Sequence, residues 1–213
     1  ESPTLGDFRA PAWLVEAEAR ALAAAERIVT PHSALAACFP RKTTKLEWAV
    51  PSRLPVRRSQ PVQRRPVVVF PASTVGRKGA YELRAAVEGL DITLKILGKN
   101  LEGADFWEGF QVERCQPGWL AEADLVVLPA YVEHQPRLLL RAAAAGIPVI
   151  ATDACGLAGV PGVREVPTGG RDVSRELRET ARSIDQLAGN LAALPPGGRA
   201  AQATIRQLTV LET

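Results

Sequence analysis

Two charged side chains in predicted loops could take part in chemistry, the carboxylate of Glu133 and the ammonium group of Lys78. Glu133 precedes a Leu- and Ala-rich segment in which Pro136 is predicted to occupy the first helical position. The start of a helix exposes backbone N–H groups and favours phosphate, and a lysine is a suitable point charge for phosphate groups. The ordinary alternatives are a solvated acid near a helix start, where negative charge is favourable, and a solvated loop lysine.

The segment from Ala123 to Asp153 positions the loop that carries the carboxylate. Leu125 to Leu128 is an apolar run typical of a strand buried on both faces. Arg137 to Ala145 predicts a helix, and Gly146 follows in the C′ position that glycine favours. Ile147 to Ala151 predicts the next strand, so the unit is βαβ and its strands are parallel. Open sheets of this kind bind ligands at the carboxyl ends of their strands.

Further apolar and amphipathic runs extend this unit to a whole domain. The run PVVVF, which comes directly before the loop with the lysine, is β-branched and predicts a strand. We therefore expect an α/β fold with a parallel sheet and flanking helices. The additional elements are strands over Pro66–Phe70, Ile92–Leu97, Phe110–Arg114 and Val163–Val166, and helices over Ala80–Leu90, Arg175–Leu194 and Ala200–Leu211.

The N-terminal part predicts a shorter series of alternating helices and strands. Thr30 or Ser33 is expected to be the N-cap of the second helix. The series consists of a helix over Pro11–Arg27, a strand over Ile28–Thr30, a helix over Ala34–Phe39 and a strand over Leu46–Val50.

A change in composition separates the two parts of the chain. Arg41 to Arg65 contains eight Lys and Arg residues, one acid and three prolines, which disfavour regular structure. This charge would attract an anionic small molecule, a lipid or a membrane surface; alternatively, the segment is a solvated basic linker. The predicted domains are an incomplete α/β domain (1–50), the linker (51–65), a ligand-binding domain (66–194) and a C-terminal helix (195–213).

Composition argues against several classes of protein. A net charge of +3 does not suggest a nucleic-acid partner. Cys38, Cys115 and Cys155 show no metal-ligand or disulfide spacing, which favours thiols in a reducing compartment such as the cytoplasm. The apolar runs fall short of the ~20 residues that a membrane span needs. The 213 residues include no Met, so we expect a piece of a longer protein.

One stretch of the chain carries a family resemblance. Glu133 to Pro136 gives E-x-x-P, a Leu run follows, and Ala142 to Thr152 gives A-x-A-x-G-x-P-V-I-A-T. This pattern resembles the nucleotide-sugar site of retaining glycosyltransferases with two Rossmann-like domains, the GT-B fold of the glycogen-synthase-like group. The resemblance implies that most of the chain is the C-terminal, Rossmann-like half of such a protein, preceded by a remnant of the acceptor-side α/β domain.

The resemblance also implies roles for individual positions. In this family the first Glu of an E-x7-E motif lies close to the donor sugar, and the second bonds the ribose hydroxyls. The first corresponds to Glu133, whereas the eighth position after it is Arg141. Family members also have G-R-x-x-x-x-K-G, whose Arg and Lys reach the donor diphosphate. Lys78 matches the Lys, Ser73 takes the Arg position, and the neighbouring Arg77 could substitute for it.

These positions imply a mechanism without a metal or a cofactor, in which a nucleotide-diphosphate sugar is the donor substrate. Lys78, with the backbone N–H groups of Arg137 and Leu138, would stabilise the negative charge that grows on the leaving diphosphate. Glu133 would orient the sugar, and Gly98 would lie under the donor.

Three functions stay open from the sequence. The first is sugar transfer, of the hexosyltransferase type, to an unknown glycan, lipid or protein acceptor, with a partner chain or a missing N-terminal segment completing the cleft. The second is a non-catalytic glycosyltransferase-like scaffold or interaction domain, which Ser73 and Arg141 favour. The third is a sugar-nucleotide epimerase of the same fold, which usually uses carboxylates and histidines, and the only histidines are His32 and His134.

Overall fold

The computed structural model describes residues 3, 4, 6, 10–51, 65–168 and 175. The chain divides into two compact units, Glu1–Leu177 and Arg178–Thr213, and every described residue belongs to the first. Nearly all of the predicted basic linker and of the two C-terminal helices lies outside the described residues. The predicted domain boundaries therefore stay predictions.

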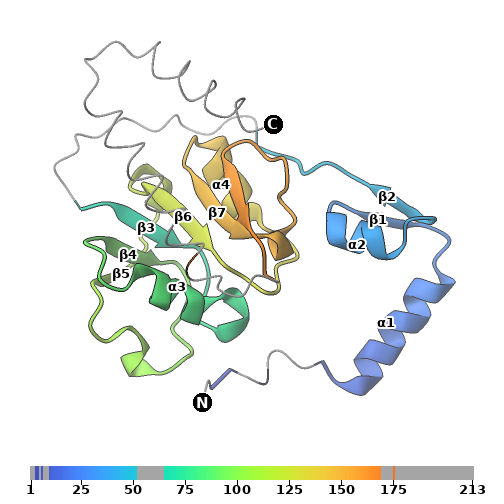
Figure 1. Ribbon diagram of the computed structural model, residues 1–213, viewed down its shortest axis with the longest axis horizontal. Coiled ribbons are helices and arrows are strands. Elements are labelled where there is room, and N and C mark those ends of the chain that lie inside the picture. Colours follow the sequence, from blue (N-terminus) through green and yellow to red (C-terminus); the bar gives the residue numbers. More distant parts are fainter. Residues whose placement is uncertain (1–2, 5, 7–9, 52–64, 169–174, 176–213) are drawn as a thin grey trace, which may run out of the picture. The chain divides into compact units, whose positions relative to one another are not determined.

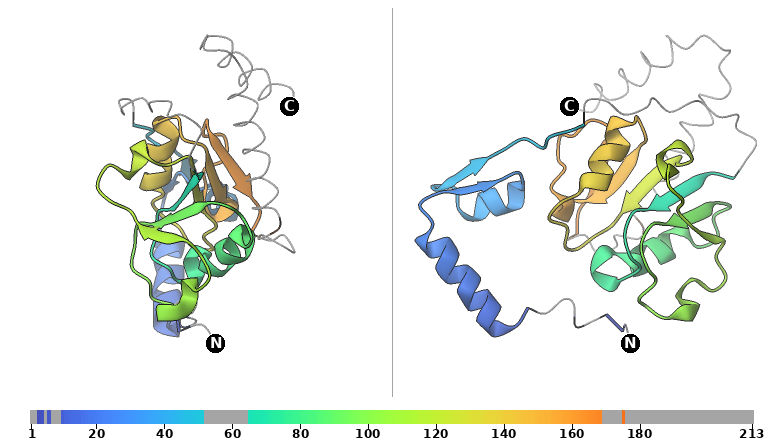
Figure 2. Two further views of the ribbon diagram at one scale, coloured as in Figure 1. Left: turned by 90° about the vertical axis from the view of Figure 1, so that its left-hand side faces the viewer. Right: turned by 180° about the vertical axis from the view of Figure 1, so that it is seen from behind.

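A six-stranded sheet with the order β5-β4-β3-β6-β7-β8 forms the core of the α/β domain (Figure 1; Figure 2). Every pair of neighbouring strands is parallel. The predicted α/β, Rossmann-like fold with a parallel sheet is therefore confirmed. The strands are β3 (Val67–Phe70), β4 (Thr93–Ile96), β5 (Val112–Arg114), β6 (Leu125–Leu128), β7 (Val149–Thr152) and β8 (Val163–Val166).

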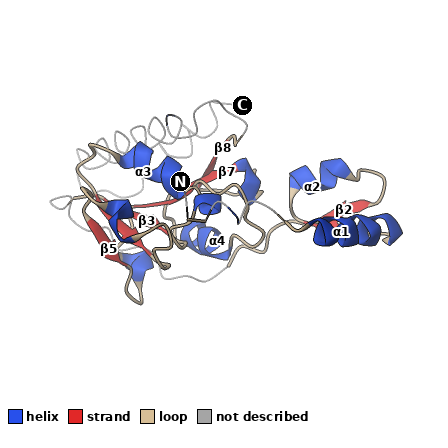
Figure 3. Ribbon diagram, turned by 90° about the horizontal axis from the view of Figure 1, so that it is seen from below, coloured by secondary structure: helices blue, strands red, loops and turns tan. Residues whose placement is uncertain are grey.

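The strand order changes direction between β3 and β6. From β3 the chain proceeds to β4 and β5 on one side, and it then returns to place β6, β7 and β8 on the other side. Because such crossovers are right-handed, the helices α3 (Ala80–Val87) and α4 (Arg137–Ala144) lie on opposite faces of the sheet (Figure 3). All residues of β3, β6 and β7 are consequently buried, as their apolar runs predict.

Both helices bury one apolar side against the sheet. In α3 this side includes Leu83, Ala86 and Val87, and in α4 it includes Leu139 and Leu140. Full burial of a leucine side chain contributes roughly 1.5–3 kcal/mol. Packing against the sheet therefore stabilises these two short helices far more than their intrinsic propensity does.

The two ends of α4 show one confirmed and one wrong prediction. Gly146 has a φ of 73° and occupies the C′ position, where its N–H donates to the carbonyl of Ala143 at 2.9 Å. Pro136, however, is the N-cap and not the first helical residue, because its ψ is 45°. It is the centre of an inverse γ-turn in which the N–H of Arg137 donates to the carbonyl of Gln135 at 2.7 Å.

The N-terminal part forms a separate pair of parallel strands, β1 and β2. The predicted strand over Leu46–Val50 is wrong, because β1 has only three residues and its register pairs Thr30 with Lys45, which ends the ladder there. Neither Thr30 nor Ser33 is the N-cap of the second helix. His32 takes that position, and its N–H donates to Oγ1 of Thr30 at 3.1 Å. The elements are α1 (Ala12–Ala24), β1 (Ile28–Thr30), α2 (Ser33–Cys38) and β2 (Thr43–Lys45).

Gly79, at the start of α3, is expected to tolerate a side chain less well than Gly89 at its end. Both glycines have positive φ, 76° and 74°, so alanine costs about 1–2 kcal/mol of backbone strain at either. A Cβ at Gly79 would also overlap the backbone of Pro129 after β6, whereas a Cβ at Gly89 would have nothing within 4 Å. In urea unfolding, Gly79→Ala should therefore lose at least about 2 kcal/mol more than Gly89→Ala. Equal losses would contradict a close approach of α3 to the end of β6.

Candidate active site

The loops that follow β3 and β6 meet where the strand order reverses. In open parallel sheets, ligands bind beside the carboxyl ends of the strands at such a point. Backbone hydrogen bonds join the two loops, because the N–H groups of Tyr131 and Val132 donate to the carbonyl of Arg77 at 3.0 and 3.3 Å. Lys78 comes from the first of these loops and Glu133 from the second.

The side chains of Lys78 and Glu133 form an ion pair at this position. Nζ of Lys78 lies 2.9 Å from Oε2 of Glu133 and also donates to the carbonyl of Val132 at 2.8 Å. Each side chain is 16% exposed, so the pair is largely removed from water but can still be reached. The structure thus brings together the two residues that the sequence marks as catalytic, and their catalytic role stays a prediction.

A short 3₁₀ helix, η2 (Gly76–Lys78), holds the lysine in place. The segment before it is attached to the chain after β4. The N–H of Thr74 donates to the carbonyl of Lys99 at 2.8 Å, and the N–H of Leu101 donates to the carbonyl of Thr74 at 3.1 Å. The position of Lys78 therefore depends on the loops after three strands, β3, β4 and β6.

The carboxyl group of Glu133 is held in its charged form. Burial is the largest single influence and raises the pKa, but hydrogen bonds from Lys78 and from the backbone of Gln135, with the positive charge of Lys78 and a contribution from His134, outweigh it and lower the pKa. The N–H of Gln135 donates to Oε1 at 2.8 Å. An ionised Glu133 can accept hydrogen bonds from hydroxyl groups but cannot serve as a general acid near neutral pH.

Ser73 and Gly98, two of the predicted donor-binding residues, lie against each other. A Cβ at Gly98 would overlap backbone atoms of Ser73. Oγ of Ser73 accepts a hydrogen bond from the N–H of Lys99 at 3.2 Å. The hydroxyl group therefore serves the local backbone and supplies none of the positive charge that an arginine would bring to this position.

Arg77 lies in η2 beside Lys78, and the last three predicted residues lie on α4. The N–H of Arg137 donates to the carbonyl of Gln135 in the γ-turn, and its role in holding a diphosphate stays a prediction. Leu138 belongs to the first turn, where backbone N–H groups have no partner within the helix. Arg141 is exposed in the last turn, and among the residues that the structure describes no ion pair or hydrogen bond joins it to Lys78 or Glu133.

The sequence analysis missed several side chains that support the loop after β6. The hydroxyl of Tyr131 donates to Oε1 of Glu82 at 2.7 Å, and burial, with this carboxylate, raises the pKa of Tyr131 to about 12. The hydroxyl of Thr152 donates to the carbonyl of Ala130. Burial raises the pKa of the nearby Cys155 to about 12, so this cysteine is a thiol and not a nucleophile. Only the threonine lies within a recognisable motif, and the helical position of Glu82 gives no signal.

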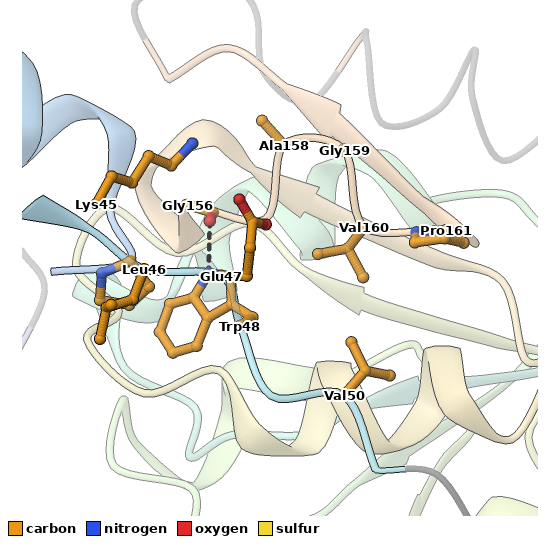
Figure 4. A pocket seen from close by; sticks show the side chains of 11 residues that line it. Lys45, Leu46, Glu47, Trp48, Val50, Gly156, Ala158, Gly159, Val160 and Pro161 are labelled. Carbon is orange, nitrogen blue, oxygen red and sulfur yellow. Dashed lines mark hydrogen bonds between the residues drawn. The ribbon is translucent and has the colours of Figure 1, made fainter.

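A small cavity lies between the segment after β2 and the glycine-rich loop after β7 (Figure 4). Nε1 of Trp48 donates to the carbonyl of Gly156 across it at 2.7 Å. Its volume of about 110 Å³ is well below the roughly 300–1,000 Å³ of typical ligand pockets, and neither Lys78 nor Glu133 lines it. We therefore locate the candidate site at the ion pair. The cavity is lined by Pro31, Lys45, Leu46, Glu47, Trp48, Val50, Gly156, Ala158, Gly159, Val160 and Pro161.

The described part of the chain has neither a candidate metal cluster nor a candidate membrane span. No group of three or more His, Cys, Asp and Glu side chains there could hold a metal ion. No helix in the same ranges is both long enough and apolar enough to cross a membrane.

Comparison with known proteins decides the family. Residues 65–190 match the family described as "Glycosyl transferases group 1", which is more than half of the 213 residues. The chain belongs to this family. The match contains the whole six-stranded sheet and both loops of the ion pair, so the candidate site lies within the glycosyl transferase domain. No curated protein sequence matches the chain.

Solved GT-B glycosyltransferases share the α/β, Rossmann-like fold of this domain. The apo lipopolysaccharide outer core galactosyltransferase WaaB is 16% identical, with a TM-score of 0.59 over 76% of this chain and 54% of its own. Anabaena HepE, solved in complex with UDP-glucose, is 15% identical, with a TM-score of 0.51 over 78% and 55%. TarM is 12% identical, with a TM-score of 0.53 over 79% and 44%. The chain thus spans about half the length of these neighbours.

The contribution of Glu133 to stability should depend on pH. Its folded-state pKa is lowered from 4.5, so as the pH falls the unfolded chain binds the proton first. The stabilisation is fully present above about pH 4.5 and is lost as the pH falls through the lowered folded-state pKa. In urea unfolding at a series of pH values, the free-energy difference between wild type and Glu133→Gln should narrow in this acid range.

The matched control repeats this comparison in Lys78→Ala, where the main group that lowers the pKa is absent. The narrowing should be smaller or reversed there, because without Lys78 the folded-state pKa of Glu133 is higher. A difference of equal size at every pH in the wild-type background would contradict the ion pair.

Proposed function

We propose that this glycosyl transferase domain is the donor-binding part of a retaining enzyme of the glycogen-synthase-like group, and that Lys78 and Glu133 bind a nucleoside-diphosphate sugar. One observation carries the proposal. At the point where strand order reverses, a cation from the loop after β3 lies 2.9 Å from an anion of the loop after β6. The complex of HepE with UDP-glucose supports a nucleotide sugar as the class of donor.

In the proposed complex, Lys78 and Glu133 no longer contact each other, and each contacts a different end of the donor. The diphosphate offers anionic oxygens to the ammonium group of Lys78. The hydroxyl groups of the sugar offer O–H donors to the carboxylate of Glu133, which its neighbours keep ionised. Each side chain thus loses its contact with the other side chain and gains a favourable contact with the ligand.

The chemical step breaks the bond between the anomeric carbon and the diphosphate oxygen and forms a bond from that carbon to an acceptor oxygen, whose proton passes to the leaving diphosphate. Positive charge then develops on the sugar ring and negative charge on the leaving group. Lys78 stabilises the latter, together with the first turn of α4 and the N–H of Leu138. Glu133 orients the sugar by accepting hydrogen bonds from its hydroxyl groups. This mechanism uses no metal or redox cofactor, because the lysine supplies the positive charge.

The acceptor side is part of the proposal. The chain spans about half of its structural neighbours, so we propose that a further segment or a partner chain completes the cleft and binds a glycan, lipid or protein acceptor. A cytoplasmic site of action, with attraction of the basic linker to a membrane surface, is consistent with this arrangement.

A non-catalytic scaffold is the second candidate function. Two family donor-contact positions carry residues that do not serve the ion pair. Ser73 supports the backbone of Lys99, and Arg141 is exposed without a bond to the pair. A scaffold of this kind would keep the fold but would not bind the donor.

Titration calorimetry with UDP and with GDP separates the two functions. We expect one of them to bind the intact chain and Lys78→Ala to weaken this binding by at least about tenfold, because the ammonium group contacts the diphosphate. The control is Arg164→Ala, which removes the same charge from an exposed position on β8 and should leave the affinity unchanged within about twofold. Absence of binding heat with both nucleotides would favour the scaffold.

A further inference from the structure

The segment that carries Lys78 is fixed by a buried carboxylate from a third loop. Glu102 follows β4 and is only 7% exposed. Its Oε1 accepts the N–H of Gly76 at 2.6 Å, and its Oε2 accepts the hydroxyl of Tyr81 at 2.8 Å. Gly76 lies two residues before Lys78 and Tyr81 lies three residues after it. One carboxylate therefore holds the chain on both sides of the lysine.

Glu102 is itself held in place. Its N–H donates to Oδ1 of Asn100 at 3.2 Å. The hydroxyl of Thr4 donates to Oε1 and accepts the N–H of Gly76 at 3.1 Å. The ring of Tyr81 packs edge-on against Phe106, with 4.9 Å between the centroids. The carboxylate is thus part of a connected network of hydrogen bonds.

Burial of a carboxylate is energetically unfavourable compared with burial of an apolar side chain. Removing its charge from water costs several kcal/mol unless hydrogen bonds compensate for it. Hydrogen bonds from a backbone N–H and a hydroxyl to a charged oxygen are short and directional, so they define a geometry that apolar packing would leave loose. We propose that Glu102 is a positioning residue, which fixes the backbone around Lys78 so that Nζ faces Glu133 and, in the proposed function, the donor diphosphate.

Removal of Glu102 should change ligand affinity in opposite directions, depending on whether this residue acts by positioning Lys78 or by its own negative charge. A carboxylate close to an anion site repels a diphosphate, so its removal would tighten binding if charge alone mattered. If Glu102 positions Lys78, its removal weakens binding, because the ammonium group is no longer held where the phosphate needs it. Only the last step, contact with a diphosphate, rests on the proposed function.

The test uses the full chain with Glu102→Ala, Lys78→Ala and the double variant. Asp124→Ala is the matched control, because Asp124 also accepts a backbone N–H, that of Val67 at 2.8 Å, but at the opposite ends of the strands. The first measurement needs no ligand: the carboxyl pKa of Glu133 is determined by NMR. The second is the affinity for UDP and GDP by calorimetry.

We expect Glu102→Ala to raise the pKa of Glu133 towards its value in Lys78→Ala, and Asp124→Ala to leave it in place. The nucleotide that binds should bind Glu102→Ala about tenfold more weakly, with no further loss when the substitution is added to Lys78→Ala. Glu102→Gln keeps an acceptor oxygen, so the pKa of Glu133 and the nucleotide affinity of this variant should lie close to those of the wild type. Tyr81→Phe removes one hydroxyl from a half-exposed ring. It should shift the pKa of Glu133 and the nucleotide affinity in the same direction as Glu102→Ala, but by smaller amounts. It therefore replaces Glu102→Ala if that variant does not fold.

Two results would overturn the inference: an unchanged pKa of Glu133 in Glu102→Ala beside a raised one in Lys78→Ala, or tighter nucleotide binding in Glu102→Ala. If the wild-type chain binds neither nucleotide, the proposed function fails. The pKa of Glu133 then decides the positioning role by itself, since that measurement contains no nucleotide.

Discussion

The contact between Lys78 and Glu133 depends on a topological constraint. Right-handed crossovers carry the chain away from β3 in one direction and then in the other, which leaves β3 and β6 as neighbours at the centre of the sheet. Their carboxyl ends open side by side, and the helices that follow diverge to opposite faces. Two loops that are 55 residues apart in the chain therefore share one position, and the 2.9 Å ion pair occupies it.

The electrostatic character of this pair suits binding more than stability. Ion pairs that are largely buried lose hydration energy that their attraction often only balances. Here each charge also has a second partner from the backbone, Val132 for the lysine and Gln135 for the carboxylate. Both groups are thus held in a defined orientation without a ligand, which is the preorganisation that recognition of a polar, anionic molecule requires.

The N-terminal elements are organised differently from the glycosyl transferase domain. β1 and β2 form a parallel pair of three residues each, and α1 contains no buried residue; its Trp13 is 67% exposed. Parallel strands are normally covered on both faces. The helical periodicity of α1 was therefore a sound indication of a helix but not of packing, because periodicity reports which side is apolar and not what lies against it.

Local patterns of apolar, β-branched and turn-forming residues were enough to predict the strands β3, β6 and β7, the glycine that ends α4, and the two loops with charged residues. They misplaced β2 and Pro136, where pairing register and a γ-turn decide. Only the tertiary structure could show that Lys78 meets Glu133, that the N–H of Arg137 is occupied, and that Glu102 supports the lysine. These are contacts between distant segments, and no local periodicity encodes which side chains a parallel sheet brings to the same edge.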